Sequence, residues 1–151
     1  KSLFSELKTY VDTQGLSTKV TFQNFVDPGN FHEYLHGFDL FIHPSCYAPD
    51  RDCEGGAPIV LLDAQACGLP IISTKHCDIP MEVLHKKTGF LAPEKDVKEL
   101  AKGIQYFYNM DQDSFLTFAE RARAHVVENF DIVKSGKRLE EIYWRLVRSV
   151  G

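Results

Sequence analysis

The sequence lacks the features that assign a chain to a membrane, fibrous or disulfide-rich class. No apolar run is long enough to span a bilayer, no signal peptide is visible, and none of the four cysteines lies in a CxxC pair. Internal repeats and Gly/Ser-rich linkers are absent. These absences predict a globular, cytoplasmic chain with free thiols. Because the first residue is Lys1 rather than Met, we expect the natural N-terminus to lie further upstream.

Excess positive charge is missing as well. The formal net charge is −4 at pH 7. A broad basic face for nucleic acid is therefore not expected, because phosphate backbones are bound mainly by clustered Lys and Arg. A small anion remains an option, since a helix N-terminus can bind one without net positive charge. The 151 residues, 44% of them hydrophobic, suffice for one domain with a sizeable core.

The cysteines leave one metal hypothesis open. Cys46 and Cys53 flank a loop, and His76 is followed directly by Cys77. A zinc site built from these residues is conceivable, but their spacing matches no structural zinc pattern. The prediction is therefore that the chain has no metal site.

Apolar periodicity along the chain alternates between strand and helix patterns. The predicted strands are 20–25, 39–45, 70–74 and 88–93, and the predicted helices are 2–13, 28–35, 58–67, 96–109, 114–128 and 132–150, with a short helical turn after Pro80. Strands that are apolar on both faces and alternate with helices predict an α/β fold with a parallel sheet. Ligands of such sheets bind at the carboxyl ends of strands, so we expect a site in the loops after Ser45 and Thr74.

The segment CEGGAPIVLLDAQACGLPIIST, from Cys53 to Thr74, has the composition of an anion-binding site. Pro58 suits the first position of a helix, whose free amides would then point over Gly55 and Gly56. Glycine allows a ligand to approach the backbone closely, and the helix dipole adds positive potential. The segment therefore predicts a phosphate-binding turn, although it lacks the GxGxxG spacing of a dinucleotide-binding turn.

Two acidic residues accompany this predicted turn. Glu54 would repel phosphate, so we expect it to accept hydrogen bonds from sugar hydroxyls. Asp63 lies about one and a half turns into the helix, on the side of Ile59, where a charged group needs partners. The alternative is that Gly55 and Gly56 only form a turn, that Glu54 is solvated, and that Asp63 bonds to a neighbouring loop.

Other polar residues at the same edge have competing interpretations. His43 is interpreted as a core histidine with satisfied hydrogen bonds in preference to a ligand-binding one. Ser45 would either donate a hydrogen bond to a ligand or belong to a Pro-Ser turn. Lys75 and His76 would either reach a phosphate or belong to a solvated loop.

The segment EGGAPIVLLDAQACGLPIIST resembles the signature of the retaining glycosyltransferases of family 4, which have the GT-B fold. That signature is an acid, a Gly/Pro loop, an apolar helix with a second acid, then A-x-G-x-P and a strand. The flanking FDLFIHPS and KKTGFLAP and the closing ENFD and LEEIYWRLV are similar to the family's other motifs, in the same order. The resemblance covers nearly the whole chain.

The resemblance implies a Rossmann-like parallel sheet with flanking helices, as in the nucleotide-sugar-binding C-terminal half of a GT-B enzyme. Glu54 would occupy the catalytic position and contact the donor sugar, and Asp63 would hold the ribose hydroxyls. The remaining donor-binding residues would be Ser45, Gly55, Gly56, Ala57, Pro58, Ile59 and Val60. The implied reaction is hexosyl transfer with retention, driven by electrostatic stabilisation of the leaving diphosphate, without a metal ion or other cofactor.

The resemblance also implies partners. The donor would be a UDP-, GDP- or ADP-sugar, and the acceptor of the full enzyme would be a saccharide or a lipid-linked molecule. Because many family members use lipid-linked acceptors, the resemblance also allows a peripheral association of the full enzyme with a membrane. The basic residues of 132–150 are nevertheless interpreted as a solvated helix face, because Glu140 and Glu141 lie among them.

The chain departs from the family pattern in four respects. Eight residues separate Glu54 and Asp63 where the family usually has seven, and the second acid is Asp rather than Glu. Met81 stands where the family often has Glu, so Glu82 would point elsewhere. From the resemblance, we also expect the family's first two strands and its N-terminal acceptor domain to be missing from residues 1–151. Residues 1–151 are therefore expected to be a partial C-terminal domain, inactive alone, with an exposed sheet edge.

Two alternatives to a glycosyltransferase remain at this point. One is a nucleotide-sugar-binding module that has lost catalysis. The other is a sugar-nucleotide epimerase of the GT-B fold. An assay of donor consumption separates the first from an enzyme, and epimerisation without an acceptor would indicate the second.

Overall fold

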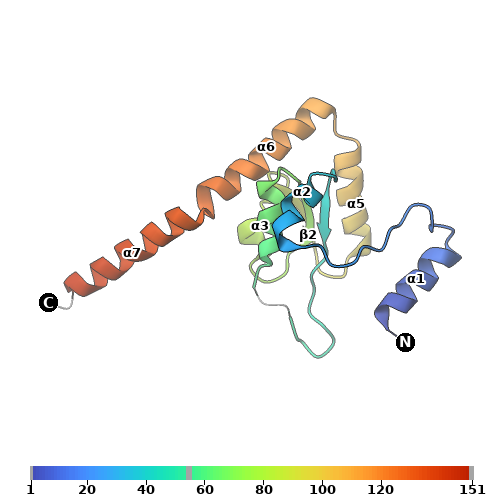
Figure 1. Ribbon diagram of the computed structural model, residues 1–151, viewed down its shortest axis with the longest axis horizontal. Coiled ribbons are helices and arrows are strands. Elements are labelled where there is room, and N and C mark those ends of the chain that lie inside the picture. Colours follow the sequence, from blue (N-terminus) through green and yellow to red (C-terminus); the bar gives the residue numbers. More distant parts are fainter. Residues whose placement is uncertain (1, 54–55, 150–151) are drawn as a thin grey trace. The chain divides into compact units, whose positions relative to one another are not determined.

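The computed structural model describes residues 2–53 and 56–149 of the chain. It consists of two units, Lys1–Phe31 and His32–Gly151, which are described separately. The elements, several of which are labelled in Figure 1, are, in chain order, α1 (Leu3–Thr13), the 3-10 helix η1 (Pro28–Asn30), α2 (Phe31–Leu35), β1 (Phe41–His43), α3 (Ile59–Ala66), β2 (Ile71–Thr74), α4 (Ile79–Glu82), β3 (Gly89–Ala92), α5 (Val97–Tyr108), α6 (Gln112–Asn129) and α7 (Ile132–Ser149).

Three short segments of the second unit form a parallel sheet with the strand order β1-β2-β3. β2 lies in the centre, with Ile71 opposite Phe41 of β1 and opposite Gly89 of β3. Every residue of β2 and β3 is buried, as expected for parallel strands covered by helices on both faces. The predicted α/β fold with a parallel sheet is therefore confirmed.

β1 differs from its prediction. It is shorter than 39–45, and Ile42 on it is 47% exposed, so the strand is not buried on both faces. The physical reason is its place in the sheet, because within the described residues β1 pairs only with β2 and is an edge strand. The expectation of an exposed sheet edge agrees with this arrangement.

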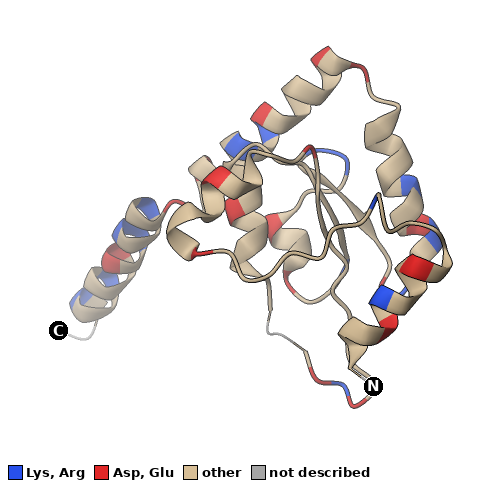
Figure 2. Ribbon diagram, turned by 45° about the vertical axis from the view of Figure 1, so that its right-hand side comes forward, with Lys and Arg blue, Asp and Glu red and all other residues tan. Residues whose placement is uncertain are grey.

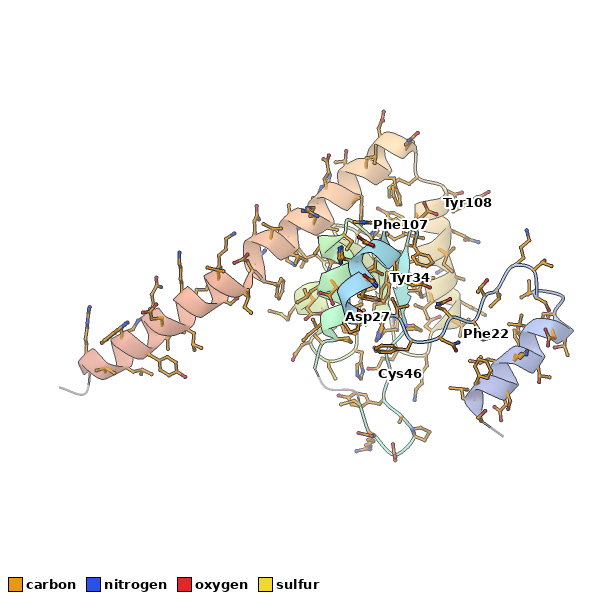
Figure 3. All side chains as sticks on the ribbon, viewed as in Figure 1. Phe22, Asp27, Tyr34, Cys46, Phe107 and Tyr108 are labelled. Atoms are coloured by element: carbon orange, nitrogen blue, oxygen red, sulfur yellow. The ribbon has the colours of Figure 1, made fainter. Side chains whose placement is uncertain are left out.

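Helices connect the strands and close the core. α3 links β1 to β2, α4 links β2 to β3, α5 packs against β2 and β3, and α6 packs against α3. Ile72 and Phe90 from the sheet form a buried cluster with Phe107 of α5 and Phe118 of α6. Phe107 is buried, whereas its neighbour Tyr108 is almost fully exposed; both are labelled in Figure 3. The position of this core fixes the strand ends that carry the candidate site.

Specific end residues account for several helix boundaries. Asp96 accepts a hydrogen bond from the Glu99 amide at 2.9 Å at the start of α5, and Asp111 accepts one from the Ser114 amide at 2.9 Å at the start of α6. The bonds to Ser114 lower the pKa of Asp111. Gly68 follows the end of α3 with a φ of +82°, the left-handed conformation predicted for it.

The first unit confirms one prediction and contradicts another. α1 agrees with the predicted helix 2–13, with Ser2 as its N-cap. Residues 20–25 form no strand, so that prediction is wrong. Apolar alternation alone does not make a strand; it needs a partner strand, and the described residues supply none here. Phe22 instead packs edge-to-face against Phe4, with ring centroids 5.2 Å apart.

α7 carries no buried residue, and its Lys and Arg residues lie on either side of Glu140 and Glu141 (Figure 2). The mixed charges agree with the interpretation as a solvated helix face. None of the helices in the described part of the chain combines the length and the apolar composition that a membrane crossing requires.

Candidate functional site

The loops that follow the three strands meet at one edge of the sheet. Parallel pairing places the end of β1 beside the end of β2, with His43 opposite Ser73, and the end of β2 beside that of β3. A hollow of about 570 Å³ opens there, lined by Ile42, His43, Pro44, Ser45, Cys46, Ala48, Asp52, Cys53 and His76. The predicted position of the site, after Ser45 and Thr74, coincides with this hollow.

Buried hydroxyls of β2 fix the first wall of the hollow. The Ser73 hydroxyl donates to the carbonyl of His43, and the Thr74 hydroxyl donates to the carbonyl of Ser45. Both hydroxyl-bearing residues are fully buried, so the backbone from His43 to Ser45 is held in one conformation. Polar β2 residues therefore position the chain that follows β1.

Two side chains on this wall remain available to a ligand. The Ser45 hydroxyl lies 2.8 Å from His43 Nδ1, and both residues are half-buried and line the hollow. His43 is thus hydrogen-bonded as expected but is not a core residue, because it lies at the end of an edge strand. Ser45, a predicted donor-binding residue, lies where a ligand in the hollow would contact it.

His76, which also lines the hollow, is buried and belongs to a hydrogen-bond network. His76 Nδ1 lies 2.8 Å from Glu94 Oε1, and the Tyr47 amide donates to Glu94 Oε2 at 3.2 Å. These bonds to the carboxylate lower the pKa of Glu94. Tyr47, His76 and Glu94 follow β1, β2 and β3 respectively, so one carboxylate joins the three loops. His76 is 3% exposed and is not part of a solvated loop, whereas Lys75 is exposed.

Sequence reasoning missed Glu94 as a positioning residue of this edge. Glu94 lies two positions beyond the end of β3. Ligands of parallel sheets bind at the carboxyl ends of strands, which applies to the loop after β3 as well as to the loops after β1 and β2. The signal was therefore present, but nothing in the sequence pairs Glu94 with His76.

The start of α3 lies beside the loop that follows β2. The Asp78 amide donates to the Gly56 carbonyl at 3.1 Å, and a Cβ on Gly56 would lie 2.7 Å from Asp78 Oδ2. A larger residue at position 56 would therefore force the Asp78 carboxylate to move aside. Pro58 is the N-cap of α3 (ψ 120°) rather than its first helical residue, so the predicted helix start is wrong by one position. No side chain caps this end, which leaves first-turn amides for a ligand.

The predicted donor-binding residues on α3 face solvent to different degrees. Ile59 is 73% exposed, and Asp63, one turn later, is exposed, so it does not need the buried partner that its apolar surroundings predicted. Ala57 and Val60 are half-buried. The structure thus brings an uncapped helix start and an exposed carboxylate to one face of α3. Glu54 and Gly55, also predicted for this site, lie outside the described residues.

Glu82 points into the protein, in agreement with the prediction that it would not occupy the position of the family's glutamate. It is 8% exposed, and its Oε2 atom has no hydrogen-bond partner within the described residues. Burial, aided by the negative charge of Asp78, raises its pKa to about 7. Met81, at the family's glutamate position, is 70% exposed.

The chain is similar in sequence to glycosyltransferases of other organisms. The profile of the family described as Glycosyl transferases group 1 matches residues 1–125. The chain is 34% identical over 125 residues to the putative colanic acid biosynthesis glycosyltransferase WcaL of Escherichia coli, covering 83% of this chain and 30% of that protein. It is 34% identical over 144 residues to the amylovoran biosynthesis glycosyltransferase AmsK of Erwinia amylovora, covering 95% of this chain and 35% of that protein.

A solved structure shows the same fold. The Anabaena protein HepE in complex with UDP superposes with a TM-score of 0.80 at 25% identity, covering 94% of this chain and 36% of that one. The chain spans about a third of the length of the relatives that it matches. The parallel sheet, the site at the strand ends and these matches lead to one conclusion: the chain belongs to the glycosyl transferases group 1 family, with the GT-B fold.

Proposed function

We propose that residues 1–151 form part of the C-terminal, donor-binding domain of a glycosyltransferase that transfers a hexose from a nucleotide sugar to an acceptor with retention. The observation that carries this proposal is the hollow at the ends of β1 and β2, which lies beside the uncapped start of α3. Free amides at a helix start bind phosphate, and an exposed carboxylate one turn further accepts hydrogen bonds from ribose hydroxyls.

Each part of a nucleotide sugar has a counterpart in this proposal. The diphosphate lies over the backbone from Gly55 to Val60, the ribose bonds to Asp63, and the transferred sugar lies against Ser45 and Glu54. As the bond to the diphosphate breaks, negative charge develops on the leaving oxygens. The first-turn amides and the positive end of the α3 dipole stabilise that charge. Transfer of this kind needs no metal ion from the protein.

The relatives support a UDP-sugar among the candidate donors. HepE has been crystallised with UDP and with UDP-glucose. The names of WcaL and AmsK associate those proteins with the biosynthesis of colanic acid and amylovoran, which favours a saccharide or lipid-linked acceptor. The acceptor would bind to parts of a GT-B enzyme that correspond to no residue of this chain, so we expect no transfer by residues 1–151 alone.

Replacing Asp63 by Asn is expected to weaken UDP binding to this chain by about 10- to 100-fold. The Asn side chain is uncharged and has one acceptor oxygen where the Asp carboxylate has two. A hydrogen bond to a charged acceptor contributes about 1.5–3 kcal/mol, which the variant would lose. Calorimetric titration with UDP, GDP and ADP measures the effect and identifies the preferred base. The matched control is Glu120→Gln, an equally conservative change at an exposed acid on α6.

Equal UDP affinity in the Asp63→Asn and Glu120→Gln variants would contradict the ribose role of Asp63. Binding that is unaffected by Asp63→Asn and equal for all three nucleotides would contradict the proposed donor site itself.

A nucleotide-sugar-binding module without catalysis is the second candidate. Met81 in place of the family's glutamate and an Asp63 side chain one methylene shorter than glutamate favour it. Such a module would bind the nucleotide sugar, and Asp63→Asn would weaken that binding as in an enzyme. A longer protein that contains this chain would then not consume the nucleotide sugar when an acceptor is present.

A further inference from the structure

Two cysteines and a histidine from separate loops converge at the rim of the hollow. Ligand atoms of Cys53, His76 and Cys77 all lie within 4.8 Å of one another. Cys53 comes from the loop after β1, whereas His76 and Cys77 come from the loop after β2. From the sequence these residues are conceivable zinc ligands, but no metal site is predicted, because 22 residues separate Cys53 from His76 and the spacing matches no structural zinc pattern.

The sulfur of Cys77 and the Nε2 atom of His76 are spaced close to what a tetrahedral zinc ion requires. Zn–S bonds of about 2.3 Å and Zn–N bonds of about 2.0 Å place a sulfur and a nitrogen about 3.6 Å apart on one ion. Cys77 Sγ lies 3.3 Å from His76 Nε2. Cys53 is exposed on a loop and its sulfur lies within 4.8 Å of the other two atoms, so its side chain must move closer to share one ion with them.

The buried histidine is already oriented for metal binding. Its Nδ1 faces Glu94 Oε1 at 2.8 Å, which leaves Nε2 facing the sulfur of Cys77. Metal-binding histidines usually donate their second ring N–H to a carboxylate in this way, which fixes the tautomer and the ring orientation. Tyr47 packs edge-to-face on the same ring at a centroid distance of 4.7 Å and further restricts its movement.

The backbone at Cys77 supports a role for its side chain. Cys77 has a φ of +42°, a conformation that is costly for any residue with a Cβ. A glycine would adopt this conformation without strain, so a cysteine at this position lowers the free energy of unfolding. The strained backbone directs the thiol toward His76 Nε2 and the Tyr47 hydroxyl, each 3.3 Å away.

We propose that Cys53, His76 Nε2 and Cys77 bind one Zn²⁺ ion, with water as the fourth ligand. Two thiolates and an imidazole select a soft or borderline ion over Mg²⁺ or Ca²⁺. Binding displaces the two thiol protons, so no oxidant or reductant is needed. The ion would tie the loop after β1 to the loop after β2, beside the hydrogen bond between Gly56 and Asp78. It takes no part in the proposed sugar transfer.

The test uses the reduced, untagged protein without nucleotide, so its outcome is separate from the proposed donor site. Competition with a chromophoric chelator measures Zn²⁺ affinity, and Co²⁺ replaces Zn²⁺ to report thiolate ligation through its charge-transfer absorption. We expect one ion per chain. Cys53→Ser should weaken Zn²⁺ binding by more than about 100-fold, because losing an outer-shell partner alone costs about 10- to 100-fold. Glu94→Gln should fall within that outer-shell range.

Two cysteines of the same chain serve as matched controls. Cys46 and Cys67 lie outside the cluster, and their Ser variants should retain Zn²⁺ affinity within about twofold. Because Cys53 is exposed, its Ser variant should fold normally, which circular dichroism checks. The proposal is overturned if wild-type protein binds no stoichiometric Zn²⁺, if Co²⁺ gives no thiolate band, or if Cys53→Ser binds as tightly as Cys46→Ser.

Discussion

Replacing Glu82 by Gln is expected to stabilise the protein by about 3 kcal/mol above pH 7 and to change its stability little below about pH 4.5. The difference between the raised pKa of about 7 and the ordinary value of 4.5 sets this magnitude, at about 1.4 kcal/mol per pKa unit. The gain is large because Oε2 has no hydrogen-bond partner within the described residues to offset its burial.

The sign follows from proton binding. The folded protein holds a proton on Glu82 up to about pH 7, whereas the unfolded chain releases it near pH 4.5. Between these values the folded state binds more protons than the unfolded state, so the free energy of unfolding falls as pH rises. Above pH 7 the carboxylate is charged in both states and the full cost of burying it remains. Gln is neutral throughout and carries no such cost.

Urea unfolding of the wild type and the variant at several pH values between about 4.5 and 8 measures this effect. The matched control is Glu128→Gln, at an exposed acid on α6. The free energy of unfolding of this variant should differ from that of the wild type by the same amount at every pH. A Glu82→Gln difference that is also flat, or that grows toward acid pH, would show that Glu82 is charged and well solvated in the folded protein.

Gly89→Ala is expected to destabilise the protein by about 3 kcal/mol or more, at the upper end of overpacking costs. Gly89 lies in β3 opposite Ile71 of the central strand. An added Cβ would lie 2.6 Å from the Ile71 carbonyl oxygen and would also overlap Val83 Cγ1. The carbonyl belongs to the sheet backbone, so it cannot move away as the end of a flexible side chain could.

Gly136→Ala is the matched control for this prediction. Nothing lies within 4 Å of a Cβ at Gly136, in the interior of α7, so the same substitution should stabilise the helix by about 0.5–1 kcal/mol. Urea unfolding followed by circular dichroism compares both variants with the wild type. A loss below about 1 kcal/mol for Gly89→Ala would mean that β3 does not approach β2 as closely as the structure shows.

The segment from Gly56 to Thr74 could be predicted from sequence because its signals are local. The apolar run of α3, the left-handed Gly68 that ends it and the buried strand β2 each depend on a few neighbouring residues. Pro58 was misplaced by one position because proline suits both the N-cap and the first turn of a helix. The parallel sheet followed from alternation of these local elements.

Predictions failed where the structure depends on residues distant in the sequence. Residues 20–25 have a strand pattern but no partner strand within the described part of the chain. The pairing of His76 with Glu94, and the approach of Cys53 to Cys77, depend on loops that only the assembled sheet brings together. The buried carboxyl of Glu82 was identified only as displaced from the family position, because burial cannot be read from a single residue type.

The central claim is that a nucleoside diphosphate binds at the ends of β1 and β2 and at the start of α3. Titration of the ¹⁵N-labelled chain with UDP, followed by backbone amide shifts, tests it most directly. The account predicts saturable shifts at Ser45, Ala57, Val60 and His76, with the amides of α5 and α6 unchanged. An absence of saturable shifts at these positions, or shifts confined to α5 and α6, would contradict it.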